Sequence, residues 1–247
     1  MGEKQQSLGR LAADIALSTF FTEINHIQNF GPAKEHLEQN RGSVLLYANH
    51  FHRLDSVVIG KVINGNIAQL NNKISVMVSK QYTDGEREEN KQIVKALGLL
   101  QKAYGFNFIS VVQEKPEEKE QYPNWERINK EATRRAIELL RMPGNMVCVM
   151  PEGTRSETGT LIQALRGFEI IMKRGGPNVL VQPLAVTHTD IKPLQMRTQI
   201  FVPESFTYEQ ILEEQRQNPQ FDVTTLAMRR IARELKPQNQ GPYRLDF

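Results

Sequence analysis

Residues 43–56 read SVLLYANHFHRLDS, and this stretch joins an apolar run to a cluster of polar side chains. Its first six residues are typical of a short buried strand. Directly after them come Asn49, His50, His52 and Asp55. Two of the five histidines in the chain therefore lie in this one stretch. Because α/β proteins place their working residues at the ends of strands, the cluster predicts a functional site.

Apolar runs of the same kind recur along the chain. Bounded by polar residues, glycine or proline, they predict buried strands at 74–79, 106–112, 146–150, 178–186 and 198–202. Helical patterns lie between them at 55–70, 88–103, 124–141 and 162–174, and one or two amphipathic helices are expected at 207–236. Alternating strands and helices predict an α/β sheet with helices covering its faces.

The N-terminal segment has a different pattern. Apolar residues recur at helical spacing over 8–30, with charged residues between them. This pattern predicts an amphipathic helix that ends at Phe30-Gly31-Pro32. Such a helix either packs on the core or lies in a membrane interface. We therefore expect an N-terminal helical segment, residues 1–40, followed by one domain, residues 41–247.

Composition excludes several classes of protein. The chain of 247 residues is 39% hydrophobic and 24% charged, as ordinary globular proteins are, and its net charge is +3. Lysine and arginine do not gather in a run, which argues against nucleic-acid binding. The single cysteine, Cys148, excludes an intrachain disulfide. No apolar stretch approaches the ~20 residues that span a bilayer. The first residues lack a secretory signal, so we expect an intracellular protein.

A second polar turn, PEGTRS at 151–156, follows the predicted strand at 146–150. Gly153 permits close approach of the backbone to a ligand, and Thr154 and Ser156 offer hydroxyl donors. Arg155 can bind a phosphate through two parallel hydrogen bonds. The turn therefore predicts anion binding; the alternative is that Thr154 or Ser156 simply caps a helix.

Helix geometry bears on which histidine pairs with Asp55. His52 lies three positions before Asp55, so both side chains would share one face of a regular helix. His50 lies five positions before it, which leaves the two about 140° out of alignment. If His50 instead sits in the turn before the helix, its ring can fold back onto Asp55. Periodicity leaves both pairings open and slightly favours His52.

The two motifs together resemble those of the glycerolipid acyltransferase family, the family of the lysophosphatidate acyltransferases. Asn49, His50 and Asp55 match its asparagine followed by His-x4-Asp. That pattern is weak alone, whereas Pro151-Glu152-Gly153-Thr154-Arg155-Ser156 is a specific match, and the order is the family's. The resemblance implies a mixed, mostly parallel sheet flanked by helices, with the amphipathic helix as an N-terminal extension.

Weaker matches extend the resemblance over most of residues 40–243. Gly105, Phe108 and Ile109 resemble the family's second motif, and Pro183 lies in a match to the fourth. Other positions that resemble family residues are Lys80, the pair Arg166-Gly167, and Leu235-Lys236-Pro237 with Gly241 and Tyr243. The chain departs from the family at Val111, where the second motif ends in an arginine. The acceptor headgroup therefore stays open.

The resemblance implies transfer of a fatty acyl group from a thioester to a lysophospholipid hydroxyl, with 1-acylglycerol 3-phosphate giving phosphatidic acid. In the family the histidine of His-x4-Asp is the base, here His50, and Asp55 would fix its tautomer. The acceptor phosphate would lie against the turn Glu152, Gly153, Thr154 and Arg155, with Lys80 and Arg166 as further cationic partners. Glu152 would orient a substrate hydroxyl or a neighbouring donor. Backbone amides near Gly153 or in the strand of the fourth motif would bind the oxyanion.

The resemblance also bears on partners. No cofactor is expected, because acyl-CoA or acyl carrier protein would serve as co-substrate. A lipid acceptor implies a peripheral protein on the cytoplasmic face of a membrane. Three alternatives remain. The acceptor could be glycerol 3-phosphate, another lysophospholipid or a lyso-ornithine lipid. His50, His52 and His188 could bind a metal. The chain could also be a non-enzymatic lipid-binding protein on the same fold.

Overall fold

The computed structural model describes residues 21–52, 55–67, 73–84, 94–95, 97–98, 101, 105–190 and 197–244, and an eight-stranded sheet forms its centre. The strands are β1 (Phe21–Asn25), β2 (Ser43–Ala48), β3 (Ile74–Ser79), β4 (Asn107–Val111), β5 (Met146–Val149), β6 (Val179–Asp190), β7 (Arg197–Phe201) and β8 (Phe206–Thr207). Their order is β1-β7-β6-β2-β5-β3-β4, and β8 pairs with β6. All pairs are parallel except β6 with β7 and β6 with β8. The predicted mixed, mostly parallel sheet is confirmed.

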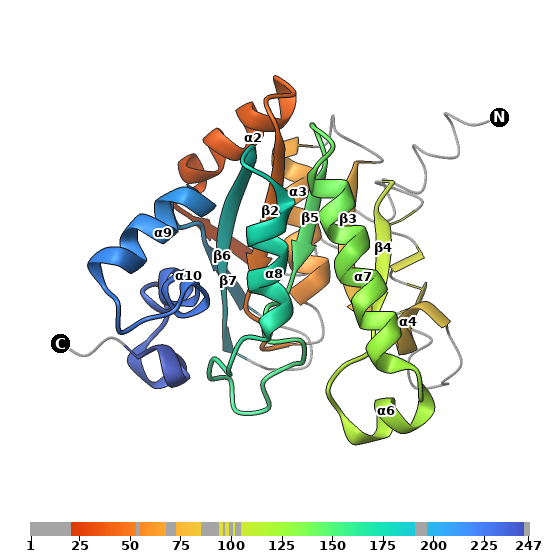
Figure 1. The fold of residues 1–247 in the computed structure, drawn as a ribbon. Helices are drawn as coiled ribbons and strands as arrows, with labels where there is room; N and C mark the ends of the chain where they lie inside the picture. Colours follow the sequence, from red (N-terminus) through yellow and green to blue (C-terminus); the bar gives the residue numbers. More distant parts are fainter. Residues whose placement is uncertain are drawn as a thin grey trace.

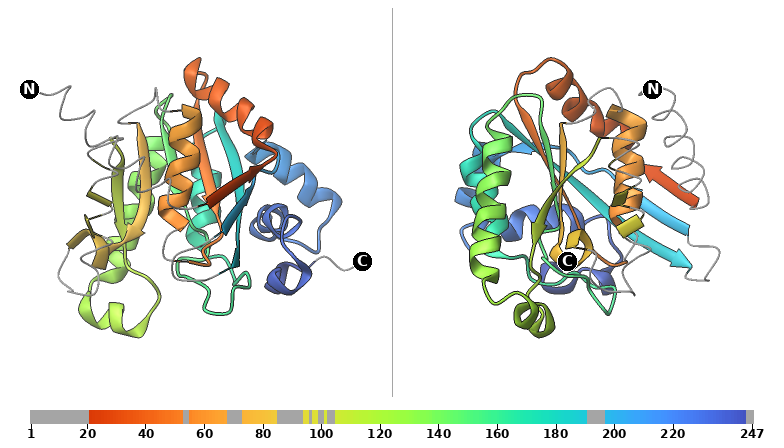
Figure 2. Two further views of the ribbon diagram at one scale, coloured as in Figure 1. Left: turned by 180° about the vertical axis from the view of Figure 1, so that it is seen from behind. Right: turned by 90° about the vertical axis from the view of Figure 1, so that its right-hand side faces the viewer.

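Helices cover both faces of the sheet (Figure 1). On one face lie α2 (Gly31–Glu38) and α3 (Asp55–Ile67), which face the viewer in the left-hand view of Figure 2. On the other lie α7 (Trp125–Leu140), α8 (Arg166–Gly175), α9 (Tyr208–Gln217) and α10 (Val223–Ala232). Shorter elements are α4 (Lys80–Asp84), α6 (Pro116–Gln121) and the 3-10 turns η1 (Ile27–Phe30), η4 (Pro237–Asn239) and η5 (Gly241–Tyr243).

The position of β2 inside the sheet explains the apolar run at the start of residues 43–56. Val44, Leu46 and Ala48 belong to the core under α2 and α3. Leu45 and Tyr47 belong to the core under α7, α8 and α10. All six residues of the strand are buried. A central parallel strand is covered on both faces, so it is apolar throughout instead of alternating with polar residues.

The predicted helix over 8–30 is wrong in its second half. Residues Phe21–Asn25 form β1, which pairs in parallel with β7, and η1 follows. Helix α2 begins at Gly31, where the sequence predicted an end, because Pro32 is well tolerated in a first helical turn. Backbone pairing with β7 thus outweighs the helical spacing of Ile24 and Ile27. Residues 8–20 lie outside the described residues.

The remaining elements lie close to their predicted positions. The five other predicted strands are present as β3 to β7, and the expected helices at 55–70, 124–141, 162–174 and 207–236 correspond to α3, α7, α8 and the pair α9–α10. The helix predicted at 88–103 falls largely outside the described residues, although 94–95, 97–98 and 101 are helical. None of the helices formed by the described residues is both long and apolar enough to cross a bilayer.

Candidate active site

Strands β2 and β5 are parallel neighbours, so the turns that follow them emerge at the same edge of the sheet. These turns carry the two sequence motifs, and the second motif binds the backbone of His50 in the first. The N–H of His50 donates to Oε2 of Glu152 over 2.7 Å, and its carbonyl accepts from the N–H of Ser156 over 2.8 Å. The sheet therefore brings together the two polar clusters found in the sequence.

His50 lies in the turn before α3, and its ring folds back onto the first residue of that helix. Nδ1 of His50 is 3.1 Å from Oδ2 of Asp55. The same oxygen accepts the backbone N–H groups of Phe51 and His52, each over 2.7 Å. Asp55 therefore pairs with the ring of His50, whereas this oxygen takes only the backbone N–H of His52.

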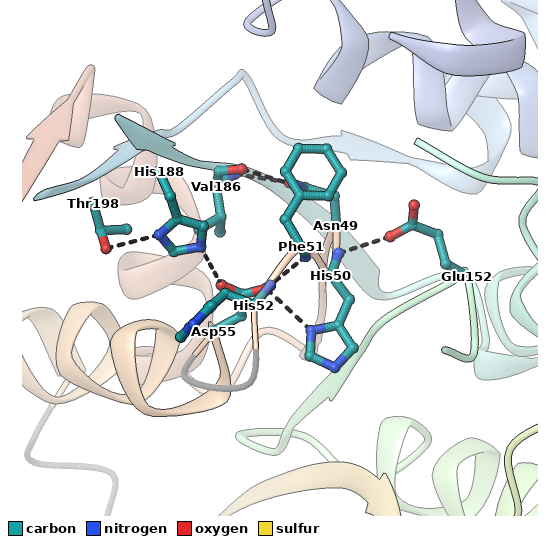
Figure 3. A network of polar contacts seen from close by, with 9 residues as sticks. All are labelled: Asn49, His50, Phe51, His52, Asp55, Glu152, Val186, His188 and Thr198. Carbon is teal, nitrogen blue, oxygen red and sulfur yellow. Dashed lines mark hydrogen bonds and ion pairs between the residues drawn. The ribbon is translucent and has the colours of Figure 1, made fainter. Parts of the chain in front are cut away.

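The second oxygen of Asp55 has a partner far along the chain (Figure 3). Nε2 of His188, on β6, lies 2.7 Å from Oδ1 of Asp55, and Nδ1 of His188 lies 3.1 Å from Oγ1 of Thr198 on β7. The Asp55 side chain has no solvent exposure. Burial acts to raise the pKa of Asp55, but the hydrogen bonds and charges of His188 and His50 outweigh it and lower the pKa to about 2. Asp55 is thus a buried anion at neutral pH.

Asn49 fixes the start of this turn. Its side-chain amide donates to the carbonyl of Val186 over 2.8 Å, and its carbonyl oxygen accepts the N–H of Val186 over 2.7 Å. The asparagine side chain carries a donor and an acceptor side by side, so it can bond a strand as a backbone segment does. The side chain thereby prolongs the β2–β6 pairing beyond Ala48 and holds His50 in place.

Glu152 binds backbone through both carboxyl oxygens. Oε2 accepts the N–H of His50, and Oε1 accepts the N–H of Ile162 over 2.9 Å. Burial raises the pKa of Glu152 to about 8, although these two N–H groups act against it. Both oxygens bind backbone donors, which fits the predicted alternative that Glu152 orients a neighbouring donor; its role towards a substrate hydroxyl stays a prediction.

One position in the turn between Glu152 and Ser156 requires glycine. Gly153 has a φ of 65°, and a Cβ there would lie 2.2 Å from Cδ1 of Leu165. Its N–H donates to the carbonyl of Met150, so this one of the amides near Gly153 is already engaged, whereas the prediction for its neighbours stands. Oγ of Ser156 accepts the N–H of Thr160, which is a structural bond inside the loop. The hydroxyl of Thr154 is buried and has no hydrogen-bond partner in the part of the chain that the structure describes.

Arg155, which belongs to this turn, lies near His52. Arg155 is partly exposed, and no carboxylate among the described residues pairs with it. The pKa of His52 is lowered, first by burial and then by the neighbouring His188, with a smaller contribution in the same direction from Arg155. His52 is therefore neutral at pH 7, whereas Arg155 supplies a positive charge beside His52.

The other predicted site residues lie further away. Lys80, the first residue of α4, donates to Asp84 over 3.0 Å. Arg166 is exposed at the start of α8. Phe108 and Ile109 lie on β4, which β3 and β5 separate from β2, and Gly105 precedes that strand with a φ of 68°.

The two predicted prolines lie closer to the motifs. Pro183 is buried in β6 opposite Tyr47, and the carbonyl of Pro151 accepts the N–H of Leu165. These residues shape the sheet and the loops around the site.

The C-terminal segment holds the loop that follows the second motif. The hydroxyl of Tyr243 accepts the N–H of Ala164 over 2.7 Å, and Asn239 donates its amide to the carbonyl of Gly159 over 2.7 Å. The N–H of Leu161 donates to the carbonyl of Asn239 over 2.8 Å. The same loop provides the Ile162 N–H that binds Glu152. Tyr243, which was matched by sequence, and Asn239, which was not, thus hold this loop.

The histidines are not arranged as a metal centre. His52 and His188 lie edge to face, with ring centroids 5.3 Å apart, and His188 points to Asp55. Within the described ranges, no group of three His, Cys, Asp or Glu side chains is placed to hold a metal ion. The sequence indicated His188 only as a metal ligand, and its contact with Asp55 was missed. Its place beyond the apolar run of β6, at the edge where β2 ends, is the signal that could have indicated it.

A comparison with solved structures finds a match over nearly the whole chain. It is the crystal structure of the 1-acyl-sn-glycerophosphate (LPA) acyltransferase PlsC from Thermotoga maritima, with a TM-score of 0.50. The chain has the fold of this acyltransferase. The match covers 94% of this chain and 80% of that chain, at 17% sequence identity. Comparison with protein-family models and with curated proteins gives no match. The fold implied by the motifs is thus confirmed.

Proposed function

We propose that the protein is an O-acyltransferase that moves a fatty acyl group from an acyl thioester to a lysophospholipid hydroxyl in phospholipid biosynthesis. One observation carries this proposal: the ring of His50 is bonded through Nδ1 to ionised Asp55 and is 14% exposed. Nε2 has no hydrogen-bond partner among the described residues. A histidine held in this way has its second nitrogen free to accept a proton from a hydroxyl.

The residues support a direct transfer without an acyl-enzyme. Nε2 of His50 takes the proton of the acceptor hydroxyl while that oxygen attacks the thioester carbonyl. Asp55 stabilises the imidazolium that forms. When the tetrahedral intermediate collapses, the C–S bond breaks, and the imidazolium returns the proton to the leaving thiolate. Cys148 takes no part, because it is buried in β5 and burial raises the pKa of its thiol to about 12.

Donors for the oxyanion are available in the turn next to His50. Glu152 and Ser156 both bind the backbone of His50, so the intervening residues lie close to it. In the described part of the chain, the N–H groups of Thr154 and Arg155 have no acceptor, and the buried hydroxyl of Thr154 has no partner. We assign the oxyanion to these donors, since the two N–H groups are among the amides near Gly153 that the sequence indicated.

The acceptor phosphate belongs beside Arg155 in this proposal. Its guanidinium is partly exposed and can bind two phosphate oxygens at once. Arg166 offers a second cation, which is exposed, at the start of α8, whereas Lys80 would first have to leave Asp84. The preferred acceptor is 1-acylglycerol 3-phosphate, which gives phosphatidic acid. Because Val111 stands where the family has an arginine, glycerol 3-phosphate and other lysolipids belong in any test.

The same proposal places the protein at a membrane surface. A lysolipid acceptor resides in a bilayer, and the segment before β1 carries the amphipathic pattern of an interfacial helix. We propose a peripheral protein on the cytoplasmic face, with acyl-CoA or acyl carrier protein as donor and no bound cofactor.

The proposal is tested by thiol release from a long-chain acyl-CoA or acyl carrier protein. Acceptors are 1-acylglycerol 3-phosphate, glycerol 3-phosphate, lysophosphatidylcholine and a lyso-ornithine lipid, and products are identified by mass. We expect release that depends on the acceptor, is greatest with 1-acylglycerol 3-phosphate and is lost in His50→Ala. Absence of acceptor-dependent release with every pair would overturn the proposed enzyme activity and leave a lipid-binding protein.

A further inference from the structure

The carboxylate of Asp55 lies between two histidines, and the mechanism above uses only one of them. His50 bonds Oδ2 and His188 bonds Oδ1 (Figure 3). The contact to His188 is the shorter, at 2.7 Å against 3.1 Å, and it joins residues 133 positions apart. A contact of this length to a fully buried carboxylate calls for a role in the site.

We propose that His188, backed by Thr198, is a positioning residue that fixes the Asp55 carboxylate and tunes the basicity of His50. This inference rests on the proposed acyltransfer, in which His50 is the base. His188 would not touch substrate; it acts through Asp55. The unit that prepares the nucleophile is then His50-Asp55-His188-Thr198, drawn from the β2–α3 turn, the start of α3, β6 and β7.

His188 is excluded as the base by its own contacts. Both of its ring nitrogens are engaged, Nε2 with Asp55 and Nδ1 with Thr198. Its side chain is 5% exposed, against 14% for His50. A base needs a free nitrogen that can reach the hydroxyl proton. Of the two histidines, only His50 has one within the described structure.

The sheet sets the position of His188. His188 and Thr198 are directly paired residues of the antiparallel strands β6 and β7, so the hydroxyl lies beside Nδ1 without any adjustment of the backbone. If the hydroxyl donates to Nδ1, the proton of neutral His188 is on Nε2 and points at Asp55. Thr198 is 1% exposed, so bulk water does not compete for this contact. The pair thus presents one fixed N–H donor to the carboxylate.

The N–H of His188 and the ring of His50 both hydrogen-bond the Asp55 carboxylate, so both interact with its negative charge. The titratable groups that face His188 are Asp55 from α3 and His52 from the preceding turn, with His50 beyond the carboxylate and Arg155 beside His52. Removing the His188 N–H leaves the charge of Asp55 more concentrated on His50. The imidazolium form of His50 is then favoured, so its protonation moves to higher pH. The carboxylate also loses an anchor that holds it in line with Nδ1.

The test compares His188→Ala, His188→Gln and the matched control His36→Ala. Glutamine keeps an N–H donor near the position of Nε2 but cannot titrate. His36 lies on α2, at the opposite edge of the sheet, where it contacts the carbonyl of Asn178. The readouts are kcat, KM and the pH profile of kcat/KM with a long-chain acyl-CoA and 1-acylglycerol 3-phosphate. Thermal unfolding of each variant is followed in parallel.

We expect His188→Ala to lower kcat by about 10-fold to 100-fold, by analogy with the loss when partners behind metal-ligating histidines are removed. KM should change little. The acidic limb of the profile should move up by about half a pH unit or more. His188→Gln should recover most of kcat and the wild-type limb, and His36→Ala should match wild type. A folded His188→Ala with the wild-type pH profile and kcat would overturn the proposal, as would a His188→Gln no better than alanine.

A second measurement does not depend on turnover. In ¹⁵N-histidine spectra, His188 should show a proton on Nε2 and none on Nδ1. Thr198→Val should disturb this signal, and Thr198→Ser should restore it. A proton on Nδ1, or a His188 signal unchanged in Thr198→Val, would contradict the arrangement. If wild type shows no acyl transfer but the spectra are as expected, the proposed function fails and the His188-Asp55 pairing stands.

Discussion

Asp55 has no contact with solvent, yet its carboxylate accepts hydrogen bonds from two imidazoles and two backbone amides. A buried charge without such partners would be costly. With them, the anion orients the ring of His50, and in the proposed mechanism it compensates the charge that this ring gains during transfer. The chemistry of the site therefore depends on how completely one carboxylate is satisfied.

Asp55→Asn tests this at the level of one residue. The pKa of Asp55 is lowered from 3.8 to about 2 in the folded protein, so its stabilising contribution is present above about pH 4 and is lost as pH falls towards 2. We expect Asp55→Asn to lower the free energy of unfolding by about 2 kcal/mol at neutral pH. The loss of stability that protonation of Asp55 causes in the wild type below about pH 4 should be absent from the variant. Urea unfolding from pH 2 to 7 measures both effects. A variant with the same slope as wild type below pH 4 would contradict the assignment.

The sequence could predict only part of this residue-level picture. His50 and Asp55 came from the family resemblance, because helix periodicity alone slightly favoured His52. The structure shows why: His50 lies outside the helix, where periodicity does not apply. His188 could not be paired with Asp55 in advance, since the contact spans β6 and α3 and depends on the register of the sheet.

At the scale of elements, the site is two turns joined through the backbone of one histidine. The turn after β5 reaches His50 through Glu152 and Ser156, and Gly153 lets it bend between them. The strands that carry these turns were predictable because buried parallel strands are apolar throughout. Strand β1 was not, because its residues have helical spacing and only the neighbouring β7 makes them a strand.

Gly153→Ala tests the turn, with Gly159→Ala as a matched control. Both glycines have positive φ, at 65° and 70°, so each alanine should cost about 1–2 kcal/mol in backbone strain. Only at Gly153 would the new Cβ also press on Leu165, whereas at Gly159 the nearest atom is 3.9 Å away. We expect Gly153→Ala to be the less stable variant in urea and to lose at least about tenfold in turnover, because His50 shifts with the turn. Equal stability and activity of the two variants would contradict this role of the turn.

At the scale of the whole molecule, the parallel sheet joins motifs that are remote in sequence. Adjacent parallel strands β2 and β5 end at the same edge, so residues 49–55 and 151–156 meet although more than a third of the chain separates them. The fold was predictable from the alternation of strands and helices and from the order of the motifs. The role of the first twenty residues was not, because an amphipathic pattern fits core packing and a membrane interface equally.

Deletion of residues 1–20 tests the proposed membrane contact. The truncation must stop before β1, because β1 pairs with β7, and Phe30, Ala33 and Leu37 beyond it belong to the core. We expect the shortened protein to keep its circular dichroism and thermal midpoint while losing co-sedimentation with anionic liposomes. Undiminished sedimentation would show that these residues are not the membrane contact.

The central claim is that His50, and not its neighbour His52, is the base for acyl transfer. The most direct test is the rate of acyl transfer from a long-chain acyl-CoA to 1-acylglycerol 3-phosphate in His50→Ala and His52→Ala, each with an unchanged unfolding midpoint. We predict a loss of about 10²–10⁴-fold for His50→Ala and less than about tenfold for His52→Ala, whose backbone N–H still binds Asp55. A His50→Ala variant that keeps its rate, or a larger loss in His52→Ala, would contradict the account.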